Sequence, residues 1–407
     1  MKIITQRKID KILGIFICGL LSLIPKRKKI NKKISYKKIL IILLSEMGSI
    51  LLAYPMFRYI KERYPDSSLS VAVFKRNREC IDIINMLSKG LIANVYSIDN
   101  QNFFRFFISS IRFLLKVRRE RVDVAIDCEL FSRIGSIYSF LSGAPIRVGF
   151  HPFTQEGLYR GDIINRKVLY NPYHHISKQF INLVCAIDSN GIPTVKRPIE
   201  KSLYTLPHIE IGYEKRIRLK ARLLERYPQL TGKNLVLIYP SGGLLPIRAW
   251  PIENFCTLSL SLINRGYAVG IIGLREDRPL ADTIKRYCKS DMCVDLTGFT
   301  RSILELLTLF NLSPLLITND GGPGHFASLT PIHSIILFGP ETPVLYGSLS
   351  KDCDHLHIPF SCSPCLTAYN HRNSPCDGNN LCLKSIGPER VLERALEILD
   401  KRKEVII

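Results

Sequence analysis

The sequence predicts an α/β protein with two domains, each built on a parallel β-sheet covered by helices. The chain has 407 residues, 46% of them apolar, and a chain of this size buries two cores more readily than one. Short continuous apolar runs alternate with amphipathic stretches in two successive series. Continuous apolar runs are typical of strands buried on both faces, and strands that alternate with helices are typical of parallel sheets.

The first series defines an N-terminal domain over residues 36–205. Its strands are expected at 38–44, 69–74 and 122–126, and its helices at 50–64, 102–119 and 131–141. A Pro-rich, irregular segment around residues 190–210 separates this series from the next one.

The second series defines a C-terminal domain over residues 206–407. Its strands are expected at 234–240, 267–273, 314–318 and 332–338, with a helix at 301–311. A small-residue loop follows the first strand of each domain, at 45–49 and at 241–243. Ligands bind beyond the carboxyl ends of strands in open parallel sheets, so two such domains facing one another would line a central cleft with both loops.

The positive charge of the chain is concentrated at its N-terminus. Residues 1–38 hold twelve Lys and Arg and one acid, Asp10, out of a formal net charge of +22. The uncharged residues 12–25 would reach roughly 20 Å as a helix, which is short of a bilayer core of about 30 Å. We interpret residues 1–35 as a basic amphipathic arm that lies on a membrane surface. The alternative is an ordinary helix packed on the first domain.

Two further features of composition bear on partners and compartment. No basic motif interleaved with aromatic residues accompanies the charge, so a nucleic-acid partner is not expected. Twelve cysteines in a chain of this length do not form a disulfide scaffold, and a reducing compartment fits best. Within a Cys-rich loop at 353–382, four cysteines have the ligand count of a structural zinc site: Cys362, Cys365, Cys376 and Cys382. The alternative is four packed or loosely paired thiols.

The sharpest motif is Thr-Asn-Asp-Gly-Gly-Pro-Gly-His-Phe-Ala-Ser at 318–328, between a buried strand and a helix-like stretch. Its glycines let the backbone come close to a ligand, and the N-terminus of a helix suits a diphosphate. Asp320 is placed to hold a ribose or sugar hydroxyl. The alternative is a tight strand-to-helix turn with Asp320 as the helix cap.

The segment Asp-Gly-Gly-Pro-Gly-His at 320–325, followed by a strand and Phe-Gly-Pro at 338–340, resembles the hallmark of glycosyltransferase family 9, whose known members include the lipopolysaccharide heptosyltransferases. Similar matches stand in order over roughly residues 36–395: the Gly48 loop with Tyr54-Pro55, Asp-Val-Ala-Ile-Asp at 123–127, Pro-Ser-Gly-Gly at 240–243 with Arg-Ala-Trp-Pro at 248–251, and Leu-Thr-Gly at 296–298.

The resemblance implies a GT-B fold, in which two Rossmann-like parallel-sheet domains face a central cleft. The first domain would bind an anionic glycolipid acceptor such as the lipopolysaccharide core. The second would bind a nucleotide-diphosphate sugar, with an ADP-sugar favoured. Transfer would invert the anomeric carbon without a metal or other cofactor, at the cytoplasmic face of the cytoplasmic membrane, where the protein would be peripheral.

Without a metal, the diphosphate leaving group must be stabilised by backbone N–H groups and cations. Arg248 is the expected cation, and its alternative is a solvated surface residue. The donor contacts expected from the resemblance are Ser241, Gly242, Arg248, Thr297, Asp320, Gly321, Gly322, Gly324 and His325, with Asp320 also expected to act in catalysis.

The first loop departs from the family pattern. Members commonly carry Gly-Asp there, and that aspartate is the proposed general base, whereas Ser49 follows Gly48 in this chain. A serine hydroxyl cannot serve as that base at neutral pH. Our hypothesis is that Glu46 replaces the aspartate. The expected acceptor contacts are Gly48, Ser49, Asp127 and Glu129, with Glu129 as the reserve base.

Other interpretations remain open at this point. Glu46 could merely cap the following helix, which would leave an impaired enzyme or a different acceptor. A catalytically impaired nucleotide-sugar or glycolipid binding protein would carry the same motifs. A GT-B-like nucleotide-sugar epimerase would act without a lipid acceptor and would not need the arm.

Overall fold

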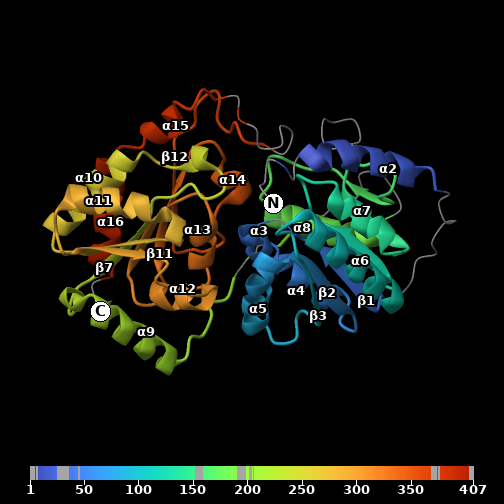
Figure 1. Ribbon diagram of the computed structural model, residues 1–407, viewed down its shortest axis with the longest axis horizontal. Coiled ribbons are helices and arrows are strands. Elements are labelled where there is room, and N and C mark those ends of the chain that lie inside the picture. The colour runs from blue at the N-terminus through green and yellow to red at the C-terminus, as the bar shows by residue number, and fades with distance from the viewer. Residues whose placement is uncertain are drawn as a thin grey trace. The chain divides into compact units, whose positions relative to one another are not determined.

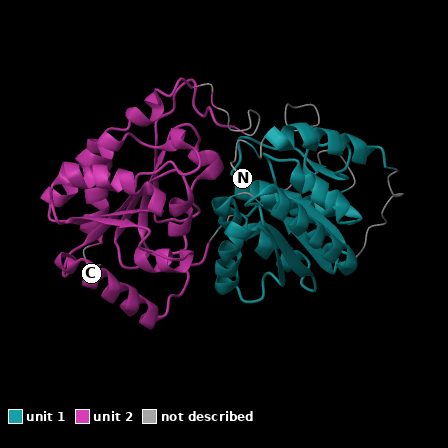
Figure 2. Cartoon of the chain, viewed as in Figure 1, with its two compact units in different colours: residues 1–205, 368–371 teal, residues 206–367, 372–407 magenta. Residues whose placement is uncertain are grey.

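The computed structural model describes residues 5, 8–24, 36–44, 46–151, 159–189, 199–200, 204, 206–367, 374 and 376–402. The chain divides into two compact units, residues 1–205 with 368–371, and residues 206–367 with 372–407 (Figure 2). Each unit holds one six-stranded parallel sheet with helices packed on it (Figure 1), which confirms the predicted fold class. The basic run at 26–29 and most of the expected linker lie outside the described residues.

The sheet of unit 1 has the strand order β3-β2-β1-β4-β5-β6. The chain moves outward from β1 to β3 and then returns past β1 to β4, so the strand order reverses between β1 and β4. Ile42 at the end of β1 lies opposite Asp127 at the end of β4, so the loops after these two strands begin side by side. The strands are β1 Lys38–Ile42, β2 Ser68–Phe74, β3 Asn94–Ile98, β4 Val124–Asp127, β5 Ile146–Phe150 and β6 Arg166–Val168.

The predicted helices of unit 1 are present with one difference, and the helices at 78–87 and 176–185 were not predicted. A single helix was expected over 50–64, but the structure has two helices there that meet at Ala53, because Pro55 has no N–H to continue the ladder of the first. Asn102 caps α6, since its Oδ1 accepts from Arg105 N at 2.9 Å. The helices are α2 Ile15–Ser22, α3 Met47–Leu52, α4 Tyr54–Arg63, α5 Arg78–Leu87, α6 Phe103–Glu120, α7 Ile134–Leu141 and α8 Ile176–Cys185.

The N-terminal helical segment packs on unit 1. A π-helical turn, Asp10–Gly14, continues into α2, and Cys18 is fully buried against Ile137 of α7 and Ile163. Asp10 Oδ2 pairs with Arg133 Nη1 at 3.0 Å. The described part of the arm is therefore a helix packed on the first domain with its outer side exposed, and the contact with a membrane surface stays a prediction. None of the helices in the described ranges combines the length and apolar character that crossing a membrane requires.

The sheet of unit 2 has the strand order β12-β11-β10-β7-β8-β9, so its order reverses between β7 and β10. Thr318 of β10 lies opposite Tyr239 of β7, which brings the loops after these two strands together. The strands are β7 Leu235–Tyr239, β8 Ala268–Gly273, β9 Cys293–Thr297, β10 Leu315–Asn319, β11 His333–Phe338 and β12 Cys353–His357.

Trp250 lies in the core of unit 2, where it is 1% exposed and packs edge-on against Phe255. Its indole Nε1 donates to the Ile386 main-chain oxygen at 2.8 Å, so the largest core side chain leaves no buried donor unpaired. The helices are α9 Tyr213–Arg226, α10 Ile252–Asn264, α11 Arg278–Cys288, α12 Ile303–Phe310, α13 Gly322–Ala327, α14 Pro343–Tyr346, α15 Leu381–Lys384 and α16 Pro388–Lys401.

Candidate functional site

Two small-residue loops of unit 2 are joined where the strand order of its sheet reverses. The buried amide of Asn319, at the end of β10, donates from Nδ2 to the main-chain oxygens of Pro240 and Ser241 at 3.0 and 3.2 Å. Its Oδ1 accepts from Trp250 N at 3.0 Å. One side chain thus holds the loop after β7 against the loop after β10. Ligands bind in parallel sheets at such a position.

Arg248, Asp320 and Glu341 gather at this carboxyl edge of the sheet. Arg248 Nη2 lies 3.2 Å from Glu341 Oε2, and Arg248 Nε lies 3.7 Å from Asp320 Oδ2. The side chains are 13%, 5% and 2% exposed in that order, so Arg248 is not the solvated surface residue of the alternative interpretation. Sequence reasoning missed Glu341, although its place directly after Phe-Gly-Pro at the end of β11 marks this edge.

Arg248 Nε and Asp320 Oδ2 face each other at 3.7 Å, which is too long for a hydrogen bond, and both atoms are buried without one in the described chain. Buried polar groups in native proteins are nearly always hydrogen-bonded, so this pair retains hydrogen-bonding capacity that a ligand could use. A guanidinium suits phosphate, and a carboxylate suits sugar or ribose hydroxyls. Asp320 is not a helix cap, because α13 has Gly321 at its N-cap and no side-chain cap hydrogen bond.

The glycines of the two loops serve different purposes. A Cβ on Gly242 would lie 2.8 Å from Leu245 O, and a Cβ on Gly324 would lie 2.6 Å from Ile336 Cδ1. These two glycines are therefore required by packing inside the unit. A Cβ on Gly321 or Gly322 would make only ordinary van der Waals contacts, at 3.9 and 3.8 Å, so packing inside the unit does not require glycine at these two positions.

Two other expected donor residues, His325 and Thr297, make contacts within unit 2. His325 is buried in α13, where its main-chain oxygen accepts from Ser328 Oγ. Thr297 ends β9, two strands from β7 and so roughly 10 Å from it at the usual strand spacing. Its hydroxyl donates to Asp295 Oδ1 at 2.6 Å. The structure therefore does not bring Thr297 into the cluster of Arg248 and Asp320.

The equivalent edge of unit 1 carries Glu46 in the loop after β1. Glu46 is at the N-cap position of α3 but makes no side-chain cap hydrogen bond, so it does not have the capping role of the alternative interpretation. Ser49, one turn later beside Gly48, donates from its hydroxyl to Glu46 Oε2 at 3.4 Å. Burial lowers the pKa of Arg76, and the negative charge of nearby Glu46 opposes that shift. Sequence reasoning missed Arg76, which follows β2 in a basic turn.

Asp127 and Glu129 support this edge from inside. Asp127 is fully buried; its Oδ2 pairs with Arg160 Nη1 at 2.9 Å, and its Oδ1 accepts from Glu129 N at 3.0 Å. Burial raises the pKa of Asp127, and Arg160 opposes that shift. Glu129 is buried too, and its Oε1 accepts from Leu44 N at 2.6 Å. The structure gives both residues a role in holding the loops together, and their expected contact with the acceptor stays a prediction.

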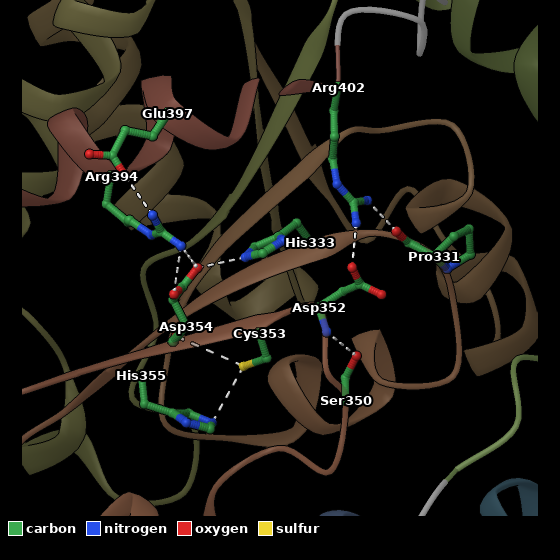
Figure 3. Close-up of polar contacts among 10 residues, drawn as sticks. All are labelled: Pro331, His333, Ser350, Asp352, Cys353, Asp354, His355, Arg394, Glu397 and Arg402. Atoms are coloured by element: carbon green, nitrogen blue, oxygen red, sulfur yellow. Dashed lines mark hydrogen bonds and ion pairs between the residues drawn. The ribbon is translucent and has the colours of Figure 1, made fainter. Parts of the chain in front are cut away.

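The chain has one Asp-x-Asp sequence, Asp352-Cys353-Asp354, a pattern that can hold a metal. The structure places it at the start of β12, at the amino end of a parallel strand, away from the ligand edge. Arg394 lies 3.0 Å from Asp354 Oδ1, His333 Nε2 lies 2.6 Å from Asp354 Oδ2, and Arg402 lies 2.6 Å from Asp352 Oδ1 (Figure 3). The two arginine contacts fasten α16 and the residue after it to the edge strand, and the His333 contact joins β11 to that strand.

The four cysteines of the predicted zinc site are all described. Cys362 and Cys376 are exposed, while Cys382 is buried. In the part of the chain that the structure describes, no three His, Cys, Asp or Glu side chains are placed to hold a metal ion. The geometry therefore gives no support to the structural zinc site.

Comparison with known proteins identifies the family. The model of glycosyltransferase family 9 (heptosyltransferase) matches residues 116–374. Lipooligosaccharide heptosyltransferase 2 of Haemophilus influenzae is 27% identical over 182 residues, which are 44% of this chain and 51% of the relative. Lipopolysaccharide heptosyltransferase 2 of Salmonella typhimurium is 26% identical over 172 residues, which are 41% and 47%. The chain thus spans about half the length of these curated relatives.

A solved structure shares the architecture of both units. The ADP-heptose LPS heptosyltransferase II of E. coli superposes with a TM-score of 0.67 at 18% identity, over 90% of this chain and 99% of that one. This likeness shows the fold, which is the GT-B arrangement of two Rossmann-like α/β domains. The family model covers more than half of the residues, and the motifs that carry the resemblance lie on the edges described above. The chain belongs to glycosyltransferase family 9.

Proposed function

We propose that this protein is an inverting glycosyltransferase that moves a heptose-type sugar from a nucleotide-diphosphate sugar, with an ADP-sugar favoured, to the lipopolysaccharide core or a related glycolipid. The observation that carries the proposal is the buried cluster of Arg248, Asp320 and Glu341 at the carboxyl edge of the sheet of unit 2. The names of the curated relatives support the choice of sugar and acceptor.

The donor part of the mechanism follows from the chemistry of the cluster. The guanidinium of Arg248 would bind the diphosphate and offset the charge that develops on it as the sugar leaves. The carboxylates of Asp320 and Glu341 would accept from hydroxyls of the sugar or ribose. Asp320 would thus act by holding the donor sugar for attack. The proposal requires no metal ion.

The acceptor part assigns the general base to Glu46. Its carboxylate would take the proton of an acceptor hydroxyl, whose oxygen attacks the anomeric carbon from the side opposite the departing diphosphate. The configuration at that carbon is inverted as a result. Ser49, which donates to Glu46 Oε2, would orient the carboxylate, and Arg76 would keep it ionised or contact an acidic group of the acceptor.

A nucleotide-binding experiment tests the donor assignment. A ligand at one hundred times its Kd stabilises a protein by about 2.7 kcal/mol, so ADP, UDP, GDP and CMP can be compared by the thermal shift they cause. We expect ADP to stabilise the full chain selectively. Stabilisation by UDP or GDP instead would keep the reaction class and change the donor, while no response to any nucleotide contradicts the proposal.

Transfer is tested with an ADP-heptose donor and lipopolysaccharide core acceptors, with product followed by mass spectrometry. We expect a glycosylated acceptor and ADP in equal amounts. Conversion of the donor without an acceptor would identify the epimerase instead. Nucleotide binding with neither product would identify a binding protein.

A further inference from the structure

Helix α6 of unit 1 is apolar on two opposite sides. Its buried side carries Phe113 and Val117. A second stripe on the far side is 42–71% exposed and repeats every three or four residues, so its members lie along one line of the helix: Phe104, Phe107, Ile111 and Leu115. A surface helix of a globular domain normally has polar residues there.

The N-terminal helical segment has the same property. Its inner side, with Gly14 and Cys18, is buried on unit 1. Its outer side is 48–79% exposed and consists of Ile12, Leu13, Phe16, Leu20 and Leu23. Contiguous exposed apolar side chains rimmed by polar residues mark an interaction site.

Helix α7 connects the two stripes on one side of the first sheet. Its Tyr138 hydroxyl lies 2.5 Å from Ser110 Oγ of α6, and its Ile137 packs against Cys18 of α2. Figure 1 shows α7 between α2 and α6. The right-handed crossovers β3 to β4 and β4 to β5 run in the same direction, which also places α6 and α7 on the same face of the sheet.

Most of the charges on α6 and the N-terminal helical segment are positive. Two acids lie on these helices in the described range: Asp10 is bound to Arg133, and Glu120 accepts from the Tyr96 hydroxyl. The cations are Lys8, Lys11, Arg105, Arg112, Lys116, Arg118 and Arg119. A second copy of this chain on the same surface would bring like charges together, whereas an anionic lipid surface satisfies both the cations and the apolar stripes.

We propose that the outer stripes of α6 and of the N-terminal helical segment together form the surface by which this protein lies on an anionic bilayer. The apolar side chains enter the interface, and the cations contact lipid phosphates. The inference rests on the proposed function in that a glycolipid acceptor is presented at a bilayer. It goes further because half of the membrane surface is then part of the acceptor-binding domain itself.

The test is flotation of the full chain with vesicles, without any nucleotide sugar. Vesicles of phosphatidylethanolamine and phosphatidylglycerol in equal parts are compared with vesicles of phosphatidylcholine alone. We expect the protein to float with the anionic vesicles. The α6 variant F104S/F107S/I111S and the segment variant F16S/L20S should each lower the partition coefficient by roughly tenfold or more, and their combination should abolish flotation.

A matched control removes exposed apolar residues elsewhere. The variant Y213S/I217S changes two side chains of α9 in unit 2 that are exposed to a similar degree, and it should float like the unchanged protein. All these positions are on the surface, so each variant should keep the melting temperature of the parent.

Three outcomes would overturn the inference. If the α6 variant floats like the parent, the N-terminal segment is the sole contact with the bilayer. Equal flotation with phosphatidylcholine vesicles would show that binding does not require an anionic lipid. If the α6 variant floats like the parent but has a lower mass than the parent in light scattering without vesicles, the α6 stripe is a contact between copies of the chain. Failure of the proposed function gives a different result. The thermal shift with ADP and transfer to a lipid-free acceptor would then be absent in the parent, whereas the α6 variant should retain both if only the membrane contact is lost.

Discussion

Glu46 is the residue on which the proposed chemistry depends most. Replacing it with Gln keeps the shape of the side chain and removes the base. We expect Glu46→Gln to lower kcat by about 10²–10⁴-fold, measured as transfer to a lipopolysaccharide core acceptor, with the ADP-induced thermal shift unchanged. Glu62→Gln, an exposed carboxylate on α4, is the matched control and should keep full activity.

A second substitution makes this test sharper. Family members commonly carry an aspartate where this chain has Ser49, so Glu46→Gln combined with Ser49→Asp restores a carboxylate to the same loop. We expect the double variant to regain activity relative to Glu46→Gln alone. Full activity in the single variant would show that Glu46 is not the base.

Arg248 has two partners that depend on its charge. The carboxylates of Asp320 and Glu341 are nearly inaccessible to water, and removing one member of a buried ion pair typically costs about 3–5 kcal/mol. We expect Arg248→Met to lower the free energy of unfolding in urea by about 3 kcal/mol and to abolish the thermal shift with ADP. Arg265→Met on the surface should do neither. Normal nucleotide binding in Arg248→Met would exclude its contact with the diphosphate.

The sequence predicted the site residues that stand in motifs and missed those that are defined by contacts. Arg248 and Asp320 were predicted because they belong to a recognisable loop. Asn319 stands in the same motif as Asp320, but its bond to Pro240, 79 residues away, could not be predicted from the sequence. The ion pair of Asp127 with Arg160, 33 residues away, has no local signal either, and the predicted acceptor contact of Asp127 stays a prediction.

At the level of elements, the predicted strands are the central ones. β1, β7 and β10 are buried on both faces and appear as continuous apolar runs. Five of the described strands were not predicted. β3, β6 and β12 are edge strands with polar, partly exposed residues. β5 and β9 are mostly buried, but Arg147 and Asp295 interrupt their apolar runs. A strand with a continuous apolar run can thus be predicted from the sequence, and a strand interrupted by polar residues cannot.

The attachment of α16 to the edge strand β12 depends on pH. Burial alone would raise the pKa of Asp354, but its bonds to Arg394 and His333 outweigh burial and hold that pKa below the usual range. A depressed carboxyl pKa in the folded state stabilises the protein above the unfolded pKa of about 3.9, and this contribution is lost as the pH falls through the folded pKa.

We therefore expect Asp354→Asn to lower the free energy of unfolding in urea by about 1 kcal/mol at neutral pH, a value kept small by partial exposure of the pair. The difference from the parent protein should shrink as the pH falls below about 3.9. Asp282→Asn on α11, which is exposed, should show no such dependence. A constant difference at all pH values would mean that the loss comes from packing and not from charge.

At the scale of the whole molecule, each unit has its own sheet and its own core. The proposed donor site at the reversal point between β7 and β10 is built from residues of unit 2. We expect hydrogen exchange of the full chain with ADP to slow in peptides covering 240–250 and 319–325. Peptides covering the first loop of unit 1, at 46–52, should keep the exchange rate of the ligand-free protein until an acceptor is added.

Because binding to the folded form stabilises it by mass action, the same nucleotide should raise the unfolding transition of unit 2 more than that of unit 1. Slowed exchange confined to unit 1 would place the donor site on the sheet of unit 1 and contradict the assignment of Arg248 and Asp320.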